Sequence, residues 1–280
     1  MANKTTKVER SGRQQGQQRG VREVDKRTRR RWRGKSSLRY GGAGLALAVV
    51  VALFVYYGRQ EASGGSGVAV ASALGPMTAS APSGSTGNFQ RVSTPLQQGS
   101  KAVLLFIGAQ YCPFCGAERW AVVKALGRFG TWSHLSQGHS SSGEAGFNSL
   151  PTFDLLRSRY TSRYVIFDHK DVADNAGNTL QKLDAQEQRL FNSYDSSGSI
   201  PLVYVDGYAM TGSDYSPAEL QGKSFSDVQR QLQQNGKAIY VKDVNAEANL
   251  LTAFLCRADG NHPARVCGAG VVPLIERAIR

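Results

Sequence analysis

The sequence predicts an α/β domain that one N-terminal transmembrane helix holds outside the cytoplasm. Three observations predict it: an uncharged apolar run near the N-terminus, a Gly/Ser-rich stretch after it, and a C-terminal part in which strand and helix patterns alternate. Such alternation is typical of α/β folds. The chain of 280 residues therefore divides into a tail (1–39), a transmembrane anchor (40–58), a linker (59–95) and a globular domain (96–280).

Residues 1–39 are expected to form a disordered basic tail. They contain 14 Lys or Arg against three acidic residues, which accounts for most of the formal net charge of +13. With few apolar side chains, the tail cannot bury enough surface to offset its chain entropy. Such a tail could bind anionic lipid or nucleic acid, but we expect it only to set membrane topology, with no nucleic-acid partner.

Residues 40–58 are predicted to form the transmembrane anchor. They carry no charge and have the apolar centre LALAVVVALFVYY. At 1.5 Å per residue such a helix spans about 28 Å, close to the ~30 Å of a bilayer core. The basic residues before it place the N-terminus in the cytoplasm. The alternatives are a buried core helix and a signal peptide that is cleaved near residues 69–73. We expect an uncleaved single-pass anchor.

Residues 59–95 are rich in Gly, Ser, Ala and Pro and show no periodic apolar pattern. This composition is typical of a flexible linker. The rest of the chain, residues 96–280, is long enough for a single hydrophobic core. We therefore expect one tethered globular domain outside the membrane.

The domain should begin with a buried strand at residues 101–109, KAVLLFIGA, because the run is apolar throughout. A helix follows directly, with apolar residues at helical spacing up to Gly130. Residues 131–149 are polar and rich in Gly and Ser, and are expected to form a loop. A second strand is predicted at residues 163–168.

The second half of the domain is predicted to be mostly helical. A helical insertion is expected over residues 180–194, and Pro201 should begin a strand that turns at Asp206-Gly207 into another. A helical C-terminal extension follows, with helices at residues 225–232, 246–256 and 274–279.

Cys112 and Cys115 lie in the motif YCPFC, where the first strand is followed by the helix. Disulfide exchange needs a thiolate, and a helix N-terminus favours one through its unpaired N–H groups and positive dipole end. Pro113 fits the first turn because a missing N–H costs nothing there. We therefore predict Cys112 as the attacking thiol and Cys115, one turn later and more buried, as the resolving thiol.

The same spacing could also serve a metal site or a structural disulfide. Zinc requires a second compact ligand pair. Cys256 and Cys267 are separated by ten residues, however, and the four histidines show no paired spacing. A disulfide across so short a loop as Cys112 to Cys115 removes little chain entropy. Redox chemistry is the favoured use, with no metal and no cofactor expected.

The order strand, YCPFC, helix and the later SIPLVYVDG resembles the thioredoxin fold. The resemblance implies a central sheet flanked by helices and makes Pro201 a cis-proline that lies against the dithiol. It also implies that the Ile200 backbone pairs with a bound polypeptide as an added strand. Pro113 and Phe114 are assigned to substrate binding with Ile200. The alternative for Pro201 is a trans proline at the start of an edge strand.

Three stretches carry a closer resemblance: FIGAQYCPFCGAERW, SIPLVYVDGYAMTGSDYSP and NLLTAFLCRADGNHPARVC. They are similar to a family of membrane-anchored thioredoxin-like proteins of bacteria and archaea that carries only a domain-of-unknown-function label. The resemblance covers about residues 90–270 and supplies no substrate. More distantly, the chain resembles thiol–disulfide oxidoreductases of the DsbA type.

The chain departs from these better-known relatives at two positions. Phe106 stands where they keep a buried acid that moves protons, and Phe114 stands where DsbA-type sites have a His. Water or Glu118 would have to transfer the proton, although Glu118 is more simply explained as a solvated helix charge. With one donor to the thiolate missing, we expect a weaker oxidant than DsbA, at about −120 to −230 mV.

Cys256 and Cys267 are expected to form a structural disulfide, because disulfides persist outside the cytoplasm and four cysteines fit two bridges. The alternative is a relay pair that exchanges electrons with the first dithiol.

The sequence thus predicts a membrane-tethered, extracytoplasmic thiol–disulfide oxidoreductase that acts on exported cysteine-containing proteins. A membrane partner of the VKOR or DsbB type would reset it. One alternative is a copper-binding or assembly-factor module on a thioredoxin scaffold, since soft thiolates suit Cu(I). The other is an interaction protein whose dithiol is incidental. The motif alone does not distinguish oxidation, reduction and isomerisation.

Overall fold

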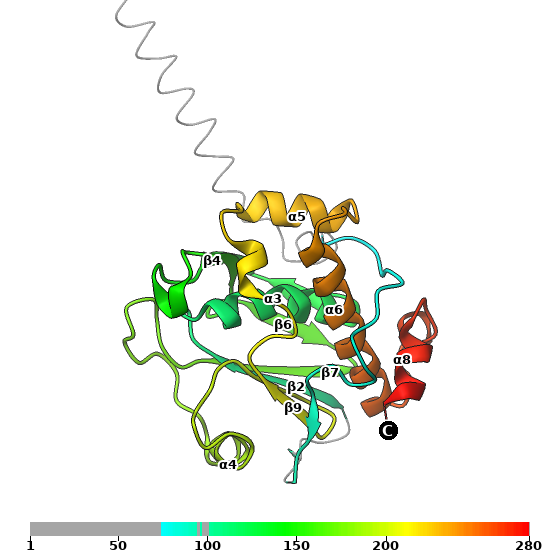
Figure 1. Ribbon diagram of the computed structural model, residues 1–280. Helices are drawn as coiled ribbons and strands as arrows, with labels where there is room; N and C mark the ends of the chain where they lie inside the picture. The colour runs from blue at the N-terminus through cyan, green and yellow to red at the C-terminus, as the bar shows by residue number, and fades with distance from the viewer. Residues whose placement is uncertain (1–73, 94–95, 97–100, 280) are drawn as a thin grey trace, which may run out of the picture. The chain divides into compact units, whose positions relative to one another are not determined.

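A five-stranded mixed sheet forms the centre of the computed structural model, which describes residues 74–93, 96 and 101–279 (Figure 1). The predicted tail, the anchor and residues 59–73 of the predicted linker lie outside the described residues. Within the described ranges, no helix is both long enough and apolar enough to cross a membrane. The predicted α/β class is confirmed.

The sheet has the strand order β1-β9-β8-β2-β7, in which β2 is parallel to β7 and antiparallel to β8. Its strands are β1 (Gln90–Arg91), β2 (Ala102–Gly108), β7 (Val165–Asp171), β8 (Leu202–Val205) and β9 (Tyr208–Thr211). Every residue of β2 is buried, as its unbroken apolar sequence predicts.

The side chains of β2 alternate between two apolar layers. Leu104 and Phe106 belong to the larger core, which lies on the side of helices α3 (Pro113–Leu126) and α6 (Ile239–Ala258). Leu105 and Ile107 point to a smaller core with Leu190 of helix α4 (Ala185–Tyr194). Figure 1 shows α4 alone below the sheet and α3 and α6 above it. The structure thus has helices on both faces of the sheet.

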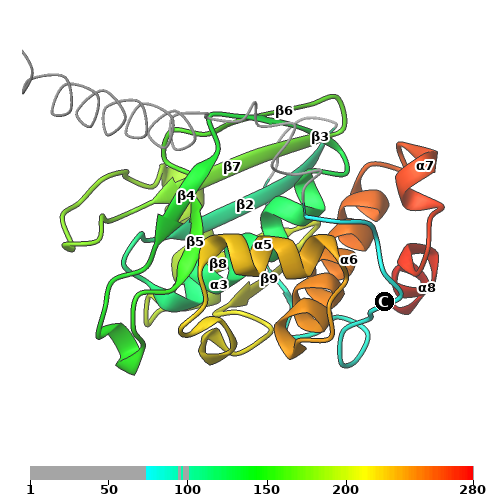
Figure 2. The same ribbon diagram turned by 90° about the horizontal axis from the view of Figure 1, so that it is seen from above.

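The predicted loop at residues 131–149 is wrong, because this part contains strands. In the chain, two antiparallel ribbons are inserted between α3 and β7 (Figure 2). Strand β3 (Gly130–Ser133) pairs with β6 (Arg159–Ser162), and β4 (Ser136–His139) pairs with β5 (Pro151–Asp154). Much of β3, β4 and β6 is exposed, so their sequence is polar. Trp132 fixes the first ribbon by packing on Tyr160 and Phe167, with ring centroids 5.0 and 5.4 Å apart.

The predicted helix at residues 180–194 begins only at Ala185, because Asp184 caps it. The Asp184 carboxylate accepts from the backbone N–H groups of Gln186 and Glu187, and Glu187 accepts from the Asp184 N–H. This reciprocal capping box fixes a helix start. Residues 180 and 181 instead form backbone hydrogen bonds with the end of β7 and the residue after it.

The predicted hairpin at Asp206-Gly207 is confirmed. Both residues have positive φ, 51° and 77°, as the two central positions of a type I′ turn require. The C-terminal helices are also present, but α6 begins seven residues earlier than the predicted start at residue 246. Further helices are η1 (Glu144–Gly146), η2 (Pro217–Leu220), α5 (Phe225–Gln233), α7 (Ala264–Cys267) and α8 (Val272–Ala278).

The linker prediction is wrong at its C-terminal end, because residues 74–92 pack on the domain. Leu74 is fully buried, and Phe89 packs on Phe254 of α6 with ring centroids 5.2 Å apart. Asn249 donates from its side-chain amide to the carbonyl oxygens of Thr78 and Ser80. Leu74 and Phe89 are thus the apolar side chains by which this Gly/Ser-rich stretch packs on the domain.

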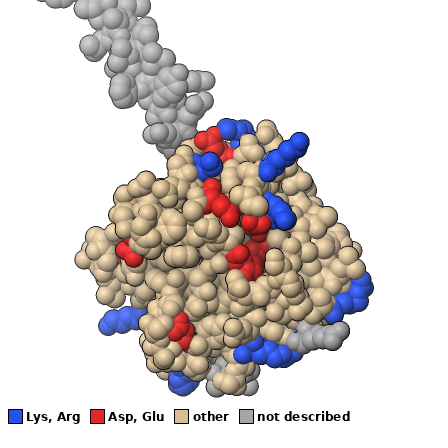
Figure 3. Space-filling view, viewed as in Figure 1, with Lys and Arg blue, Asp and Glu red and all other residues tan. Residues whose placement is uncertain are grey.

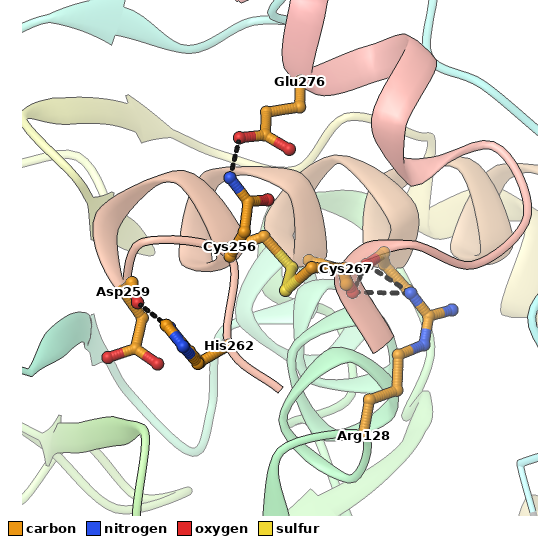
Figure 4. The surroundings of a disulfide bond; sticks show 9 residues. Arg128, Cys256, Asp259, His262, Cys267 and Glu276 are labelled. Atoms are coloured by element: carbon orange, nitrogen blue, oxygen red, sulfur yellow. Dashed lines mark hydrogen bonds between the residues drawn. A yellow bond between two sulfur atoms is a disulfide. The ribbon is translucent and has the colours of Figure 1, made fainter. Parts of the chain in front are cut away.

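A disulfide joins the end of α6 to α7 (Figure 4). Cys256 and Cys267 have an S–S distance of 2.04 Å and are both buried. In the loop between them, the Asn261 side-chain amide donates to Glu276 of α8 at 3.0 Å. The Arg128 side chain, which follows α3, donates to the carbonyl oxygen of Ala248 in α6. The disulfide therefore lies where the C-terminal extension packs on the domain.

Two glutamates are buried between α3 and α6. Glu118 and Glu247 have exposed fractions of 0% and 1%, and their carboxylate oxygens have no hydrogen-bond donor among the described residues. Burial first, then the charge of Asp214, raises the pKa of Glu118; burial, Glu118 and Asp214 raise that of Glu247. The expectation that Glu118 is a solvated charge is therefore wrong.

Figure 3 shows acidic side chains gathered on the face of the molecule that is seen in that view. Asp214, Asp243 and Glu247 line a cavity of about 190 Å³.

Glu247→Gln tests whether this carboxyl group is protonated. A raised pKa in the folded state means that stability is lost as pH rises from the ordinary glutamate value through the folded one. Each unit of elevation costs about 1.4 kcal/mol above both values. The variant should therefore show a smaller fall in melting temperature between about pH 5 and pH 9 than the parent.

The matched control is Glu144→Gln, which changes an exposed glutamate on η1. It should keep the pH profile of the parent. If Glu247→Gln also kept the parent's profile, Glu247 would be ionised in the folded protein, and burial would not have raised its pKa.

Candidate active site

Cys112 lies at the N-cap of α3, with Pro113 in the first turn. The first N–H groups of a helix have no partner within the helix, and an N-cap side chain can accept from one of them. Here the backbone N–H of Cys115 donates to Cys112 Sγ at 3.1 Å. The sulfur therefore occupies the place where other helices have a Ser or Asp oxygen, which favours its thiolate form.

The sheet topology brings a distant segment beside Cys112. Strand β8 pairs with β2 so that Leu202 lies opposite Ile107, and this places the residues before β8 next to the start of α3. Cys112 Sγ lies 3.6 Å from the carbonyl oxygen of Ile200, which accepts from the thiol. The Ile200-Pro201 peptide bond is cis. Five of the predicted residues, at positions 112, 113, 115, 200 and 201, thus belong to one site.

The two thiols have opposite pKa shifts. The hydrogen bond from the Cys115 thiol is the main cause that lowers the pKa of Cys112, and the Cys115 backbone N–H and the charge of Arg119 add to it against the effect of burial. Burial raises the pKa of Cys115 well above its ordinary value. Both cysteines are free. At neutral pH, Cys112 is the more readily ionised thiol and Cys115 remains protonated.

An apolar rim of half-buried side chains surrounds the dithiol: Tyr111, Phe114, Phe147 and Ile200. Phe114 and Phe147 meet edge to face with ring centroids 5.9 Å apart. Phe147 follows η1, in the stretch expected to be a plain loop, so sequence reasoning did not place it at the dithiol. This rim gives the site a surface that favours apolar side chains of a partner.

Arg119 is a further residue of the site that the sequence did not predict. It follows Cys115 by one helical turn and is 1% exposed. Its Nη2 donates to Asp171 Oδ1 at 2.5 Å and to the carbonyl oxygen of Ala109 at 3.1 Å. Arginine on a helix usually reaches solvent, so only the packing around α3 could reveal its burial. Phe106 stands where the better-known relatives keep a buried acid, and its ring centroid lies 5.6 Å from Cζ of the Arg119 guanidinium.

Metal ligands do not gather around the dithiol. The structure contains no group of three or more His, Cys, Asp or Glu that could hold a metal ion within the ranges it describes. Cys256 and Cys267, which the sequence singled out as a second pair, bond to each other at the far end of α6.

A family model described as domain of unknown function (DUF929) matches residues 88–257, which is more than half of the chain. The chain belongs to this family. The match includes the whole site: the dithiol, Arg119, Asp171 and the Ile200-Pro201 segment. No curated protein and no solved structure shows significant similarity to the chain. The function of this DUF929 protein must therefore be inferred from its own geometry.

Cys115→Ala should raise the pKa of Cys112, because it removes the main group that lowers it. Cys115→Ser keeps a hydroxyl donor in the same place and should raise it less. The measurement is the rate at which iodoacetamide modifies Cys112 as a function of pH, followed by mass spectrometry. Identical profiles for the parent and the alanine variant would contradict the assigned hydrogen bond.

Proposed function

We propose that this DUF929 protein is a thioredoxin-like thiol–disulfide oxidoreductase. The observation that carries the proposal is the asymmetry of the dithiol. Cys112 lies at a helix start with a lowered pKa, and the fully buried Cys115 supplies it with a hydrogen bond. A pair that shares one readily ionised and one protonated thiol is suited to successive attack and resolution.

The topology supports the thioredoxin-like part of the proposal. Strand β2, helix α3 and the parallel strand β7 are followed by the hairpin of β8 and β9 and then by α6. This order, with β2 between β7 and β8, is the arrangement that the thioredoxin resemblance implies. In such a fold the dithiol follows the central strand, as Cys112 and Cys115 follow β2.

The reduction of a substrate disulfide takes two steps at this site. The Cys112 thiolate attacks one substrate sulfur, the substrate S–S bond breaks, and the other sulfur leaves as a thiolate that takes a proton. Cys115 then loses its proton and attacks Cys112 Sγ. The Cys112–Cys115 bond forms and the second substrate sulfur leaves, so two electrons pass to the substrate. Oxidation of a substrate dithiol is the reverse.

The surface around Cys112 suits an extended, unfolded polypeptide as substrate. The Ile200 carbonyl lies next to Cys112 Sγ, so a peptide strand that pairs with this segment would present its own cysteine to the thiolate. Tyr111, Phe114 and Phe147 would contact apolar side chains beside that cysteine. Exported proteins that still lack their final disulfides have this chemistry.

The cellular setting is part of the proposal. A single-pass anchor would place the domain outside the cytoplasm, and a membrane partner of the VKOR or DsbB type would return the dithiol to its starting state. Potential and partner, rather than the dithiol itself, would set the direction of electron flow.

Cys115→Ser in cells tests the function directly. Without the resolving thiol, Cys112 should remain in mixed disulfides with its substrates, and mass spectrometry should identify exported proteins with cysteines among them. The double variant Cys112→Ser/Cys115→Ser is the control and should form none. The absence of adducts in the single variant, together with Cu(I) binding at Cys112, would overturn the proposal in favour of a copper module.

A further inference from the structure

We propose that the buried Arg119–Asp171 ion pair is the positioning device of the dithiol and supplies the charge that acts on its two sulfurs. This inference rests on the redox function proposed above. It explains which charge acts on the thiols at a site whose central strand carries Phe106 in place of an acid.

The ion pair is connected to Cys115 through one residue, Ala109. Arg119 Nη2 donates to the carbonyl oxygen of Ala109, and the backbone N–H of Ala109 is hydrogen-bonded to the Cys115 thiol. Asp171 is the last residue of β7, and Gly108 lies opposite it in the sheet. The carboxylate therefore fixes the guanidinium at the end of β2, directly behind the dithiol.

The cation at this place acts on both sulfurs. The charge of Arg119 lowers the pKa of Cys112 and counteracts the effect of burial on the pKa of Cys115. Asp171, at 2.5 Å from the guanidinium and 1% exposed, neutralises part of that charge. Removing the Asp171 carboxylate alone should therefore lower the pKa of Cys112. Removing both members of the ion pair should raise it.

Other titratable groups face the pair from the surrounding elements. His169 on β7 feels the charges of both Asp171 and Arg119, and His139 on β4 and Asp154 at the end of β5 line a cavity together with Arg119. Burial lowers the pKa of His169, so this imidazole is neutral at pH 7. The ion pair is thus the principal charge next to the two cysteines.

The proposal is tested by the pH titration of Cys112 in the purified full chain. Asp171→Asn should shift the iodoacetamide rate profile of Cys112 to lower pH, because the cation loses its counter-charge. Arg119→Gln/Asp171→Asn should shift it to higher pH. The exposed ion pair of α5 offers a matched control: Arg230→Gln/Asp227→Asn should leave the profile unchanged.

Shifts in the same direction, or no shift in a folded variant, would overturn the proposal, because a merely structural pair would not reverse sign. If the double variant fails to fold by its melting curve, the direction of the Asp171→Asn shift decides. These titrations need no cellular substrate, so they are independent of the trapping experiment that tests the function.

Discussion

The burial of helix α3 on nearly all sides is the constraint on which the rest of the structure depends. Thirteen of its fourteen residues are buried, because it lies between the sheet, α6 and the inserted ribbons. Only Phe114 reaches the surface. A helix so enclosed has no solvated face for its charged residues, so each of them must find a partner inside the protein or lose its charge.

The fates of these charges explain features that otherwise look unrelated. Arg119 pairs with Asp171 next to the dithiol. Lys124 donates to the carbonyl oxygens of Leu74 and Gly75, which ties the end of the linker to the domain, and burial lowers its pKa to about 7. Glu118 lies with Glu247 of α6, and burial raises the pKa of its carboxyl group well above the ordinary value. One enclosed helix thus accounts for the packed linker end, the acidic cluster and the charge at the active site.

The sequence predicted the parts of the fold whose signals are local. The apolar run of β2, the helix start at Cys112 and the turn at Asp206-Gly207 follow from burial, proline placement and backbone conformation within a few residues. The mistakes share a different cause. The ribbons around Trp132 and the position of Glu118 depend on neighbours that lie far away in the chain, and polar composition alone predicted a loop and a solvated charge.

The same distinction holds for the site. Cys112, Cys115 and the Ile200-Pro201 segment could be named from the sequence, because a motif and a resemblance mark them. Arg119 and Asp171 could not, because the sequence shows only an arginine on a helix and an aspartate at a strand end. Their pairing depends on the parallel register of β2 and β7, which places Asp171 opposite Gly108.

The central claim is that Cys112 and Cys115 form a reversible redox pair, and a redox titration tests it most directly. The purified full chain is equilibrated with glutathione buffers, and free thiols at each cysteine are counted by alkylation and mass spectrometry. We expect one two-electron transition of this pair between about −120 and −230 mV, with Cys256 and Cys267 remaining oxidised. The absence of a disulfide between Cys112 and Cys115 at every potential would contradict the claim, whereas a transition below the potential of thioredoxin, about −270 mV, would contradict only the expected range.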